Sequence, residues 1–149
     1  RLPLLWLEQY PRGLGPTIHQ VAELLPGLTP LAKTCFSAWR APAFAARLRR
    51  TRCRQLLLAG IETHVCVYQT ALDLLAAGYH VEVVADAVSS RTEPNRRLGI
   101  ERMQAAGAGV TTVEMALFEL LRDAQDPRFK AVAALLKQQP GDGRDPDRC

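Results

Sequence analysis

Short, continuous apolar runs alternate along the chain with stretches in which apolar residues recur every three or four positions. The first pattern is typical of buried parallel strands, and the second of amphipathic helices. Together they predict strands at 4–7, 55–60, 79–85 and 107–111, and helices at 17–25, 42–50, 66–77, 94–106, 113–122 and 127–137. This alternation predicts an α/β fold, a doubly wound, mostly parallel sheet with helices on both faces.

Several residues mark where these elements begin or end. Thr17 is predicted to cap a helix, Pro94 to open one, and Gly78 to end one. The polar stretch 86–93 predicts a loop. The helix predicted over 113–122 is expected to bury four apolar side chains, which are Met115, Leu117, Phe118 and Leu121.

Length and composition fit a single globular domain. The chain has 149 residues, of which 48% are hydrophobic and 23% charged, and these fractions exclude disordered and collagen-like chains. Residues 138–149 are rich in glycine, proline and charge. We therefore predict a domain over residues 1–137 followed by a disordered tail.

Charge and cysteine content narrow the class of protein further. The net charge of +4 is small for a dedicated nucleic-acid binder, so no nucleic-acid partner is expected. No apolar run approaches the roughly 20 residues that span a bilayer, so no membrane partner is expected either. The four cysteines form no CxxC pair, which favours reduced thiols and a cytoplasmic location.

Cys66 is the first candidate for chemistry, because it follows the clearest predicted strand and begins the next helix. Ligands of doubly wound sheets bind at the carboxyl ends of strands. Amide groups and the helix dipole at that position favour a thiolate, and they would also stabilise an oxyanion. Buried, inert cysteines are common, so the local pattern leaves both interpretations open.

Three sequence blocks carry a resemblance to a known family. The first is Gly60-Ile61-Glu62-Thr63-His64-Val65-Cys66-Val67, and the second runs from Gly78 to Arg91. The third combines Glu8-Gln9-Tyr10-Pro11 with Lys33-Thr34-Cys35-Phe36-Ser37-Ala38-Trp39. In the order in which they occur along the chain, these blocks resemble the isochorismatase-like cysteine hydrolases, in the branch called isochorismatase domain-containing.

The resemblance implies a three-layer α/β/α fold and an Asp–Lys–Cys triad. Cys66 matches the family nucleophile and Lys33 the triad lysine, which would support the thiolate. A cis peptide bond is implied between Ile61 and Glu62, and it would aim the amide of Glu62, with that of Cys66, at a substrate oxyanion. His64, Tyr10, Phe36 and Trp39 are expected to line the pocket, although the three aromatic residues would equally suit subunit contacts.

The third triad member has no match. The family aspartate ends a first, central strand, whereas no Asp precedes Asp73 here, and Glu8 matches a different block. The sheet is therefore expected to lack the family's first strand, which would leave its two neighbours without a shared partner. We expect an N-terminally truncated domain, with negligible turnover by this chain alone.

Two functions remain open at this point. One is cysteine-dependent hydrolysis of a small molecule, at an amide C–N or a similarly activated bond, through a covalent cysteine intermediate. The other is a catalytically silent binding or assembly module of the same fold. We expect no cofactor, no metal and a homo-oligomer, since His19, His64 and His80 do not reproduce the family's metal-binding spacing. A nucleotide-binding Rossmann domain is disfavoured because no glycine fingerprint follows a strand.

Overall fold

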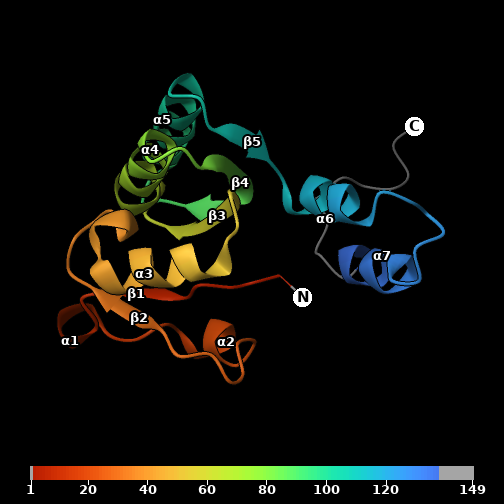
Figure 1. The fold of residues 1–149 in the computed structure, drawn as a ribbon, viewed down its shortest axis with the longest axis horizontal. Coiled ribbons are helices and arrows are strands. Elements are labelled where there is room, and N and C mark those ends of the chain that lie inside the picture. Colours follow the sequence, from red (N-terminus) through yellow and green to blue (C-terminus); the bar gives the residue numbers. More distant parts are fainter. Residues whose placement is uncertain (1, 138–149) are drawn as a thin grey trace.

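A computed structural model describes residues 2–137 of the chain. Its strands are β1 (Leu7–Gln9), β2 (Leu31–Lys33), β3 (Gln55–Ile61), β4 (His80–Ser89) and β5 (Gly109–Thr111). Its helices are α1 (Pro11–Leu14), α2 (His19–Ala22), α3 (Pro42–Thr51), α4 (Tyr68–Ala76), α5 (Glu93–Ala105), α6 (Val113–Leu121) and α7 (Phe129–Lys137). Two short turns, the 3₁₀ turn η1 (Ala38–Arg40) and the π-helical turn η2 (Thr63–Val67), complete the order drawn in Figure 1.

The strands form two parallel sheets. β1 pairs with β2, and β3 pairs with β4, which pairs with β5. No strand pairing joins the two sheets within residues 2–137. The α/β fold with parallel strands and flanking helices is thus confirmed. That a further family strand belongs between the two sheets stays a prediction.

One hydrophobic core serves both sheets. Most of its buried side chains come from α3, α4, β4 and α5, and Leu7 of β1 and Leu31 of β2 pack against them. Neighbouring residues of β4 point to opposite faces of the sheet, because side chains alternate along a strand. Val83 therefore faces this core, whereas the buried Val84 faces the other side, where α6 contacts β4. Helices consequently lie on both faces of β4.

The first strand begins later than its apolar run predicts. Leu4 is 49% exposed, and pairing starts with the bond from the Leu31 amide to the Trp6 carbonyl. Pro30 has no N–H, so the ladder cannot extend further toward the amino end of β2. The prediction of a buried strand at 4–7 is therefore wrong in its limits.

The predicted helix over 17–25 shrinks to the four residues of α2. Thr17 does not cap it, because its amide donates to Glu8 Oε1 (2.8 Å) and its hydroxyl accepts from Trp6 Nε1 (2.7 Å). Both contacts tie the loop to β1 and its approach. Tertiary hydrogen bonding has here overridden the local capping signal.

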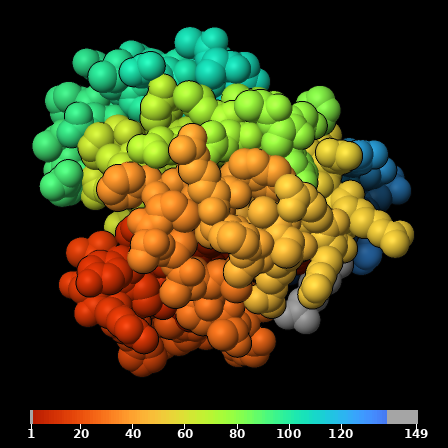
Figure 2. Space-filling view, turned by 60° about the vertical axis from the view of Figure 1, so that its left-hand side comes forward, coloured from red at the N-terminus to blue at the C-terminus, as the bar shows by residue number. Residues whose placement is uncertain are grey.

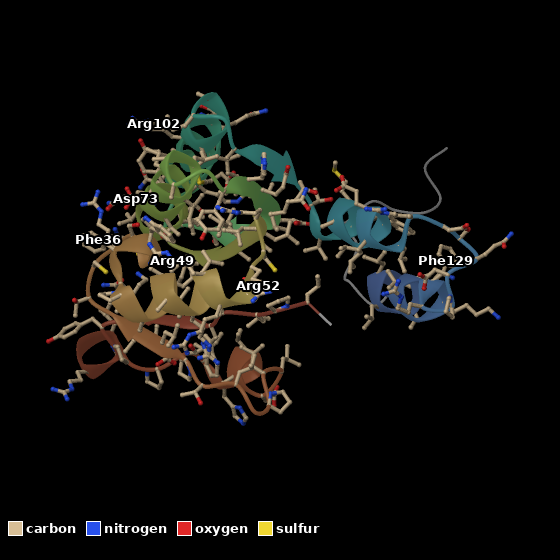
Figure 3. The ribbon with its side chains drawn as sticks, in the orientation of Figure 1. Phe36, Arg49, Arg52, Asp73, Arg102 and Phe129 are labelled. Atoms are coloured by element: carbon tan, nitrogen blue, oxygen red, sulfur yellow. The ribbon has the colours of Figure 1, made fainter. Side chains whose placement is uncertain are left out.

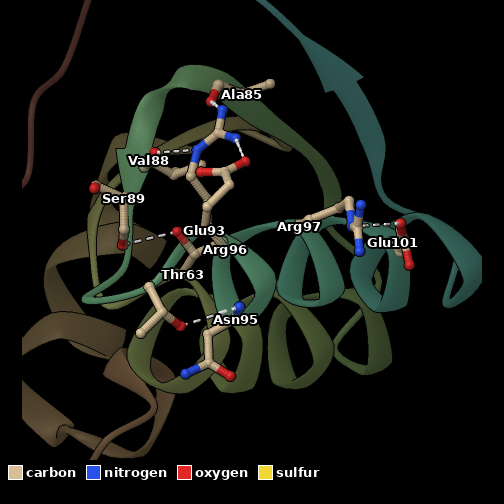
Figure 4. Close-up of polar contacts among 10 residues, drawn as sticks. Thr63, Ala85, Val88, Ser89, Glu93, Asn95, Arg96, Arg97 and Glu101 are labelled. Atoms are coloured by element: carbon tan, nitrogen blue, oxygen red, sulfur yellow. Dashed lines mark hydrogen bonds and ion pairs between the residues drawn. The ribbon is translucent and has the colours of Figure 1, made fainter.

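The predicted loop over 86–93 is strand as far as Ser89. Arg96 of α5 supports this extension, as Figure 4 shows, by donating to the carbonyls of Ala85 (2.7 Å) and Val88 (3.1 Å). The pairing of β3 with β4 shifts register between Leu58 and Gly60. Polar residues therefore continue the strand, because a side chain from the next helix satisfies its backbone.

Two apolar residues of α6 face outward, contrary to expectation. Met115 is 51% exposed and Phe118 39% exposed, whereas Leu121 is buried. Phe118 contacts Phe129 of α7, with ring centroids 6.2 Å apart. Figure 1 shows why, because α6 and α7 lie side by side and apart from the other helices.

Other boundary signals are confirmed. α5 carries Pro94 in its first turn, and Gly78 follows the end of α4 with a φ of 81°. That positive φ lets the Tyr79 amide donate back to the Leu74 carbonyl and so close the helix end. The disordered tail predicted at 138–149 lies outside the described residues.

Candidate active site

The carboxyl ends of β1 and β2 place two polar side chains together. Gln9 and Lys33 are the last residues of these strands and register partners. Lys33 is only 9% exposed, and its ammonium donates to Gln9 Oε1 and to the carbonyls of Cys35 (3.1 Å) and Phe36 (2.9 Å). These acceptors offset the desolvation of a buried charge.

Gln9 links Lys33 to Cys66. Its Oε1 accepts from the Lys33 ammonium and lies 3.9 Å from Cys66 Sγ, while its Nε2 donates to the Thr34 carbonyl (2.7 Å). The bond to Thr34 fixes which way the amide faces. The structure therefore brings Cys66 and Lys33 to the same oxygen atom, although the two residues are distant in sequence.

The segment that carries Cys66 turns sharply at the end of β3. Gly60 has a φ of 110°, which favours glycine, and the bond between Ile61 and Glu62 is cis, as the resemblance implies. The Glu62 carbonyl then accepts from the amides of Val65 (3.1 Å) and Val67 (3.2 Å). Cys66, which is partly buried, lies in the resulting turn η2 and leads into α4.

Thr63, three residues before Cys66, does not cap the turn η2 with its side chain. Its hydroxyl donates to the Ser89 carbonyl of β4 (2.8 Å), and the residue is fully buried (Figure 4). Thr63 therefore ties η2 to the neighbouring strand.

Gly99 of α5 permits close packing against the same turn. A Cβ added at this position would lie 3.0 Å from His64 Cα and 3.1 Å from the carbonyl carbon of Thr63. Any larger side chain would press on the backbone two to three residues before Cys66. Glycine is unfavourable in the middle of a helix, so its presence there is the sequence signal that could have identified this close contact.

A charged cluster borders the turn. Glu62 Oε2 accepts from the Arg91 amide (3.2 Å), and it lies 3.5 Å from Arg91 Nε and 3.7 Å from His64 Nδ1. His64 Nδ1 also lies 3.0 Å from Ser90 Oγ. Glu62 and Ser90 both approach Nδ1 of His64, rather than one on each ring nitrogen. These three residues therefore do not form a relay of the serine-protease type.

Within residues 2–137, no carboxylate contacts Lys33 or Cys66. Glu8 points to the opposite side of β1 and accepts from the Thr17 amide. Asp73 forms an ion pair with Arg40 (2.8 Å), whose hydrogen bond holds the pKa of Asp73 below its usual value. Neither residue is placed to act as the acid or base of Cys66.

The expected pocket residues separate into two places. Tyr10 and Phe36, both about half exposed, adjoin Lys33 through their backbones. Trp39 instead stacks edge-on against Tyr79, with centroids 5.4 Å apart, and lies under Arg49. Trp39 therefore lies with Tyr79 near the amino ends of β3 and β4, whereas Tyr10 and Phe36 adjoin Lys33.

The structure also shows the state of the cysteines and which metal-binding groups and long apolar helices the described residues lack. The three cysteines of the described part of the chain are free thiols. Among residues 2–137, no group of three or more His, Cys, Asp or Glu side chains is placed to hold a metal ion. None of the helices formed by these residues has both the length and the apolarity to cross a membrane.

Gln9 and Gly99 are the two site residues that sequence reasoning did not single out. Gln9 was visible only as part of a block shared with the family. Its position at the end of a strand, in register with the triad lysine, is the signal that would have identified it.

The sequence pattern of the isochorismatase domain matches residues 5–115 of the chain. Isochorismatase domain-containing protein 2A of Mus musculus is 43% identical over 138 residues, which cover 92% of this chain and 65% of that protein. The chain thus spans about two thirds of the length of this curated relative.

Solved structures give the same picture. The MAR1 ribonuclease of Caenorhabditis elegans is 39% identical with a TM-score of 0.85, covering 99% of this chain and 77% of that one. The YcaC gene product of Escherichia coli, described as an octameric hydrolase of unknown specificity, is 26% identical (TM-score 0.79, 91% and 74% covered). YcaC of Pseudomonas aeruginosa, solved with covalent acrylamide, is 29% identical (TM-score 0.81, 91% and 73% covered).

Proposed function

Because the chain belongs to the isochorismatase domain family, we propose that it is a cysteine-dependent hydrolase fold in which Cys66 is the nucleophile. The observation that supports this most directly is the shared contact of the Cys66 thiol and the Lys33 ammonium with Gln9 Oε1. Gln9 and Lys33 thereby place a hydrogen-bonded polar pair next to the Cys66 thiol, whose deprotonated form is the nucleophile.

The proposed chemistry is attack on an activated carbonyl of a small molecule. Cys66 Sγ bonds to the carbonyl carbon, and the carbonyl oxygen receives the electron pair. The amides of Glu62 and Cys66 stabilise that oxyanion. The leaving amine departs with a proton, and water then hydrolyses the thioester to release the acid and restore the thiol. We propose that Tyr10, Phe36 and His64 line the pocket that holds this small molecule.

We further propose that the chain alone completes this cycle very slowly. Protonating the leaving amine and activating water both need an acid–base group. In the described part of the chain, the neighbours of Lys33 are an amide and two carbonyls, none of which is a carboxylate. Steady-state turnover of small amides by the purified chain, if abolished by Cys66→Ala, would contradict this part of the proposal.

Thiol labelling tests the nucleophile without requiring turnover. We expect iodoacetamide at neutral pH to modify Cys66 faster than Cys53 or Cys35, and Lys33→Met to reduce that preference by about tenfold. Cys53→Ser is the matched control and leaves the rate at Cys66 unchanged. The covalent acrylamide of the P. aeruginosa relative makes acrylamide a suitable second reagent. Equal rates at the three cysteines would instead favour the silent binding or assembly module.

Two further properties of relatives are proposals for this chain. The octameric E. coli relative supports a homo-oligomer, which light scattering of the purified chain would test. The C. elegans relative is a ribonuclease, so RNA is the competing substrate class. We expect no Cys66-dependent cleavage of single-stranded RNA, because the proposed oxyanion site is built for a carbonyl.

A further inference from the structure

The larger of two described cavities lies at the opposite end of β3 and β4 from Cys66. Its volume is about 440 Å³, which is within the range of small-molecule sites. Arg54 and Tyr79 lie directly before β3 and β4, whereas Cys66 follows the carboxyl end of β3. Because the two strands are parallel, the cavity is at their amino ends and is separate from the candidate active site.

Three guanidinium groups and two aromatic rings form most of the cavity wall. Arg49 lies over the Trp39 ring at 4.8 Å, and Arg54 lies over the Tyr79 ring at 5.5 Å. The third guanidinium belongs to Arg52, at the end of α3, where Figure 3 labels it. Stacking on a ring restricts a long side chain, so two of these cations are held in place before any ligand arrives.

The charge around the cavity is unbalanced. Between Glu23 and Glu62, the sequence has no acidic residue. Within the described residues, Arg40 has a carboxylate partner, Asp73, but Arg49, Arg52 and Arg54 have none. The orange and yellow part of Figure 2, which includes α3, shows that this segment covers one face of the molecule.

Helix ends offset only part of this charge. α3 and α4 both end at the cavity, and each helix end contributes about −0.5 of a charge. With the three guanidinium groups, the net charge around the cavity is about +2. This charge balances the charge of about −2 on a phosphate monoester at neutral pH. Arginine side chains also have the planar donor geometry that phosphate oxygens accept in pairs.

From this balance we propose that the cavity binds a small phosphate monoester of nucleotide size. Arg49, Arg52 and Arg54 hold the phosphate, and the remaining volume accommodates the esterified group. The proposal is independent of the hydrolase assignment, since within residues 2–137 no cavity residue forms a hydrogen bond or ion pair with Cys66 or Lys33. Binding is therefore expected to be the same in the Cys66→Ala chain.

Calorimetric titration of the 149-residue chain at low ionic strength tests the proposal. AMP is the probe, adenosine the uncharged control, and inorganic phosphate separates phosphate recognition from recognition of the whole ester. We expect AMP to bind and adenosine not to bind. Arg49→Gln and Arg54→Gln are each expected to weaken AMP binding by about tenfold or more. Arg47→Gln and Arg50→Gln, on the same helix but outside the cavity wall, are expected to change it less than about twofold.

Several outcomes would overturn this assignment. They are no AMP binding, equal binding of adenosine, and equal losses in all four arginine variants, which would mean non-specific attraction. Binding of a short single-stranded RNA without binding of AMP would also overturn it, in favour of an extended nucleic-acid surface. If the cavity variants fail to fold, thermal unfolding of the unaltered chain decides: AMP must raise its midpoint and adenosine must not.

Discussion

Positive charge has different surroundings at the carboxyl ends of β1 and β2 and at the amino ends of β3 and β4, which we call the carboxyl edge and the amino edge. At the carboxyl edge, Lys33 is buried and its ammonium has three oxygen acceptors. At the amino edge, Arg49, Arg52 and Arg54 surround an open cavity without a carboxylate partner in the described part of the chain. A satisfied cation stabilises the structure around it, whereas unsatisfied cations repel one another until an anion binds. The cation at the carboxyl edge is thus paired within the protein, whereas the cations at the amino edge are paired only when an anion binds.

Removing the ammonium group of Lys33 is expected to have the largest effect on stability. Lys33→Met leaves Gln9 Oε1 and two backbone carbonyls without their donor, so we expect a loss of about 2 kcal/mol in the free energy of unfolding. Urea unfolding measures this, with the exposed Lys130→Met as control, expected to stay within about 0.5 kcal/mol. Equal effects of the two variants would remove the contrast between the edges.

The next effect concerns the turn that carries Cys66. Gly99→Val places a branched side chain against the backbone of His64, which must move, so we expect a loss of about 1.5 kcal/mol and slower labelling of Cys66. Ala105→Val, at an exposed position of the same helix, controls for the lower helix propensity of valine. If both variants label Cys66 at the unaltered rate, close packing of α5 does not position the turn.

A smaller pair of effects, opposite in sign, distinguishes paired from unpaired arginines. Arg52→Gln relieves repulsion in the empty cavity, so we expect a gain of up to about 0.5 kcal/mol at low salt that disappears at high salt. Arg40→Gln removes the partner of Asp73, and we expect a loss of stability. Urea unfolding at two salt concentrations gives both numbers, and effects of the same sign would contradict the comparison.

The smallest expected effect is a pH dependence from Asp73. The hydrogen bond from Arg40 holds the pKa of Asp73 in the folded chain below its usual value of 3.8. The unfolded chain therefore takes up this proton first, and the stabilisation is present above pH 3.8 and is lost as the pH falls through the folded pKa. Carbon-detected NMR titration of the Asp73 carboxyl tests this directly, and Arg40→Gln should return its pKa toward 3.8.

The sequence predicted the larger elements well, for a physical reason. β3 and α4 have clear apolar patterns, and local signals such as Gly78 and Pro94 mark the end of α4 and the start of α5. α2 and the start of β1 are short, so their limits depend on distant partners. Thr17 illustrates this, since its hydrogen bonds go to Trp6 and Glu8 rather than to its own helix.

The candidate site was predictable only in part. Cys66 and Lys33 came from family blocks, and the structure brings both to Gln9. The part played by Gln9 depends on the pairing of β1 with β2, which no local pattern encodes. The contact of Trp39 with Tyr79 likewise depends on how η1 packs against the residue before β4, which no local pattern encodes.

The division into two sheets has a consequence for the exchange of backbone amide protons with solvent. In an α/β domain the strands next to the middle of the sheet normally keep their amide protons longest. Here β1 and β3 each have a single hydrogen-bonded neighbour among residues 2–137, and Leu57 and Ile61 of β3 are 49% and 68% exposed. Amides on the unpaired sides of β1 and β3 should therefore take up deuterium early, while those of β4, paired on both sides, remain protected.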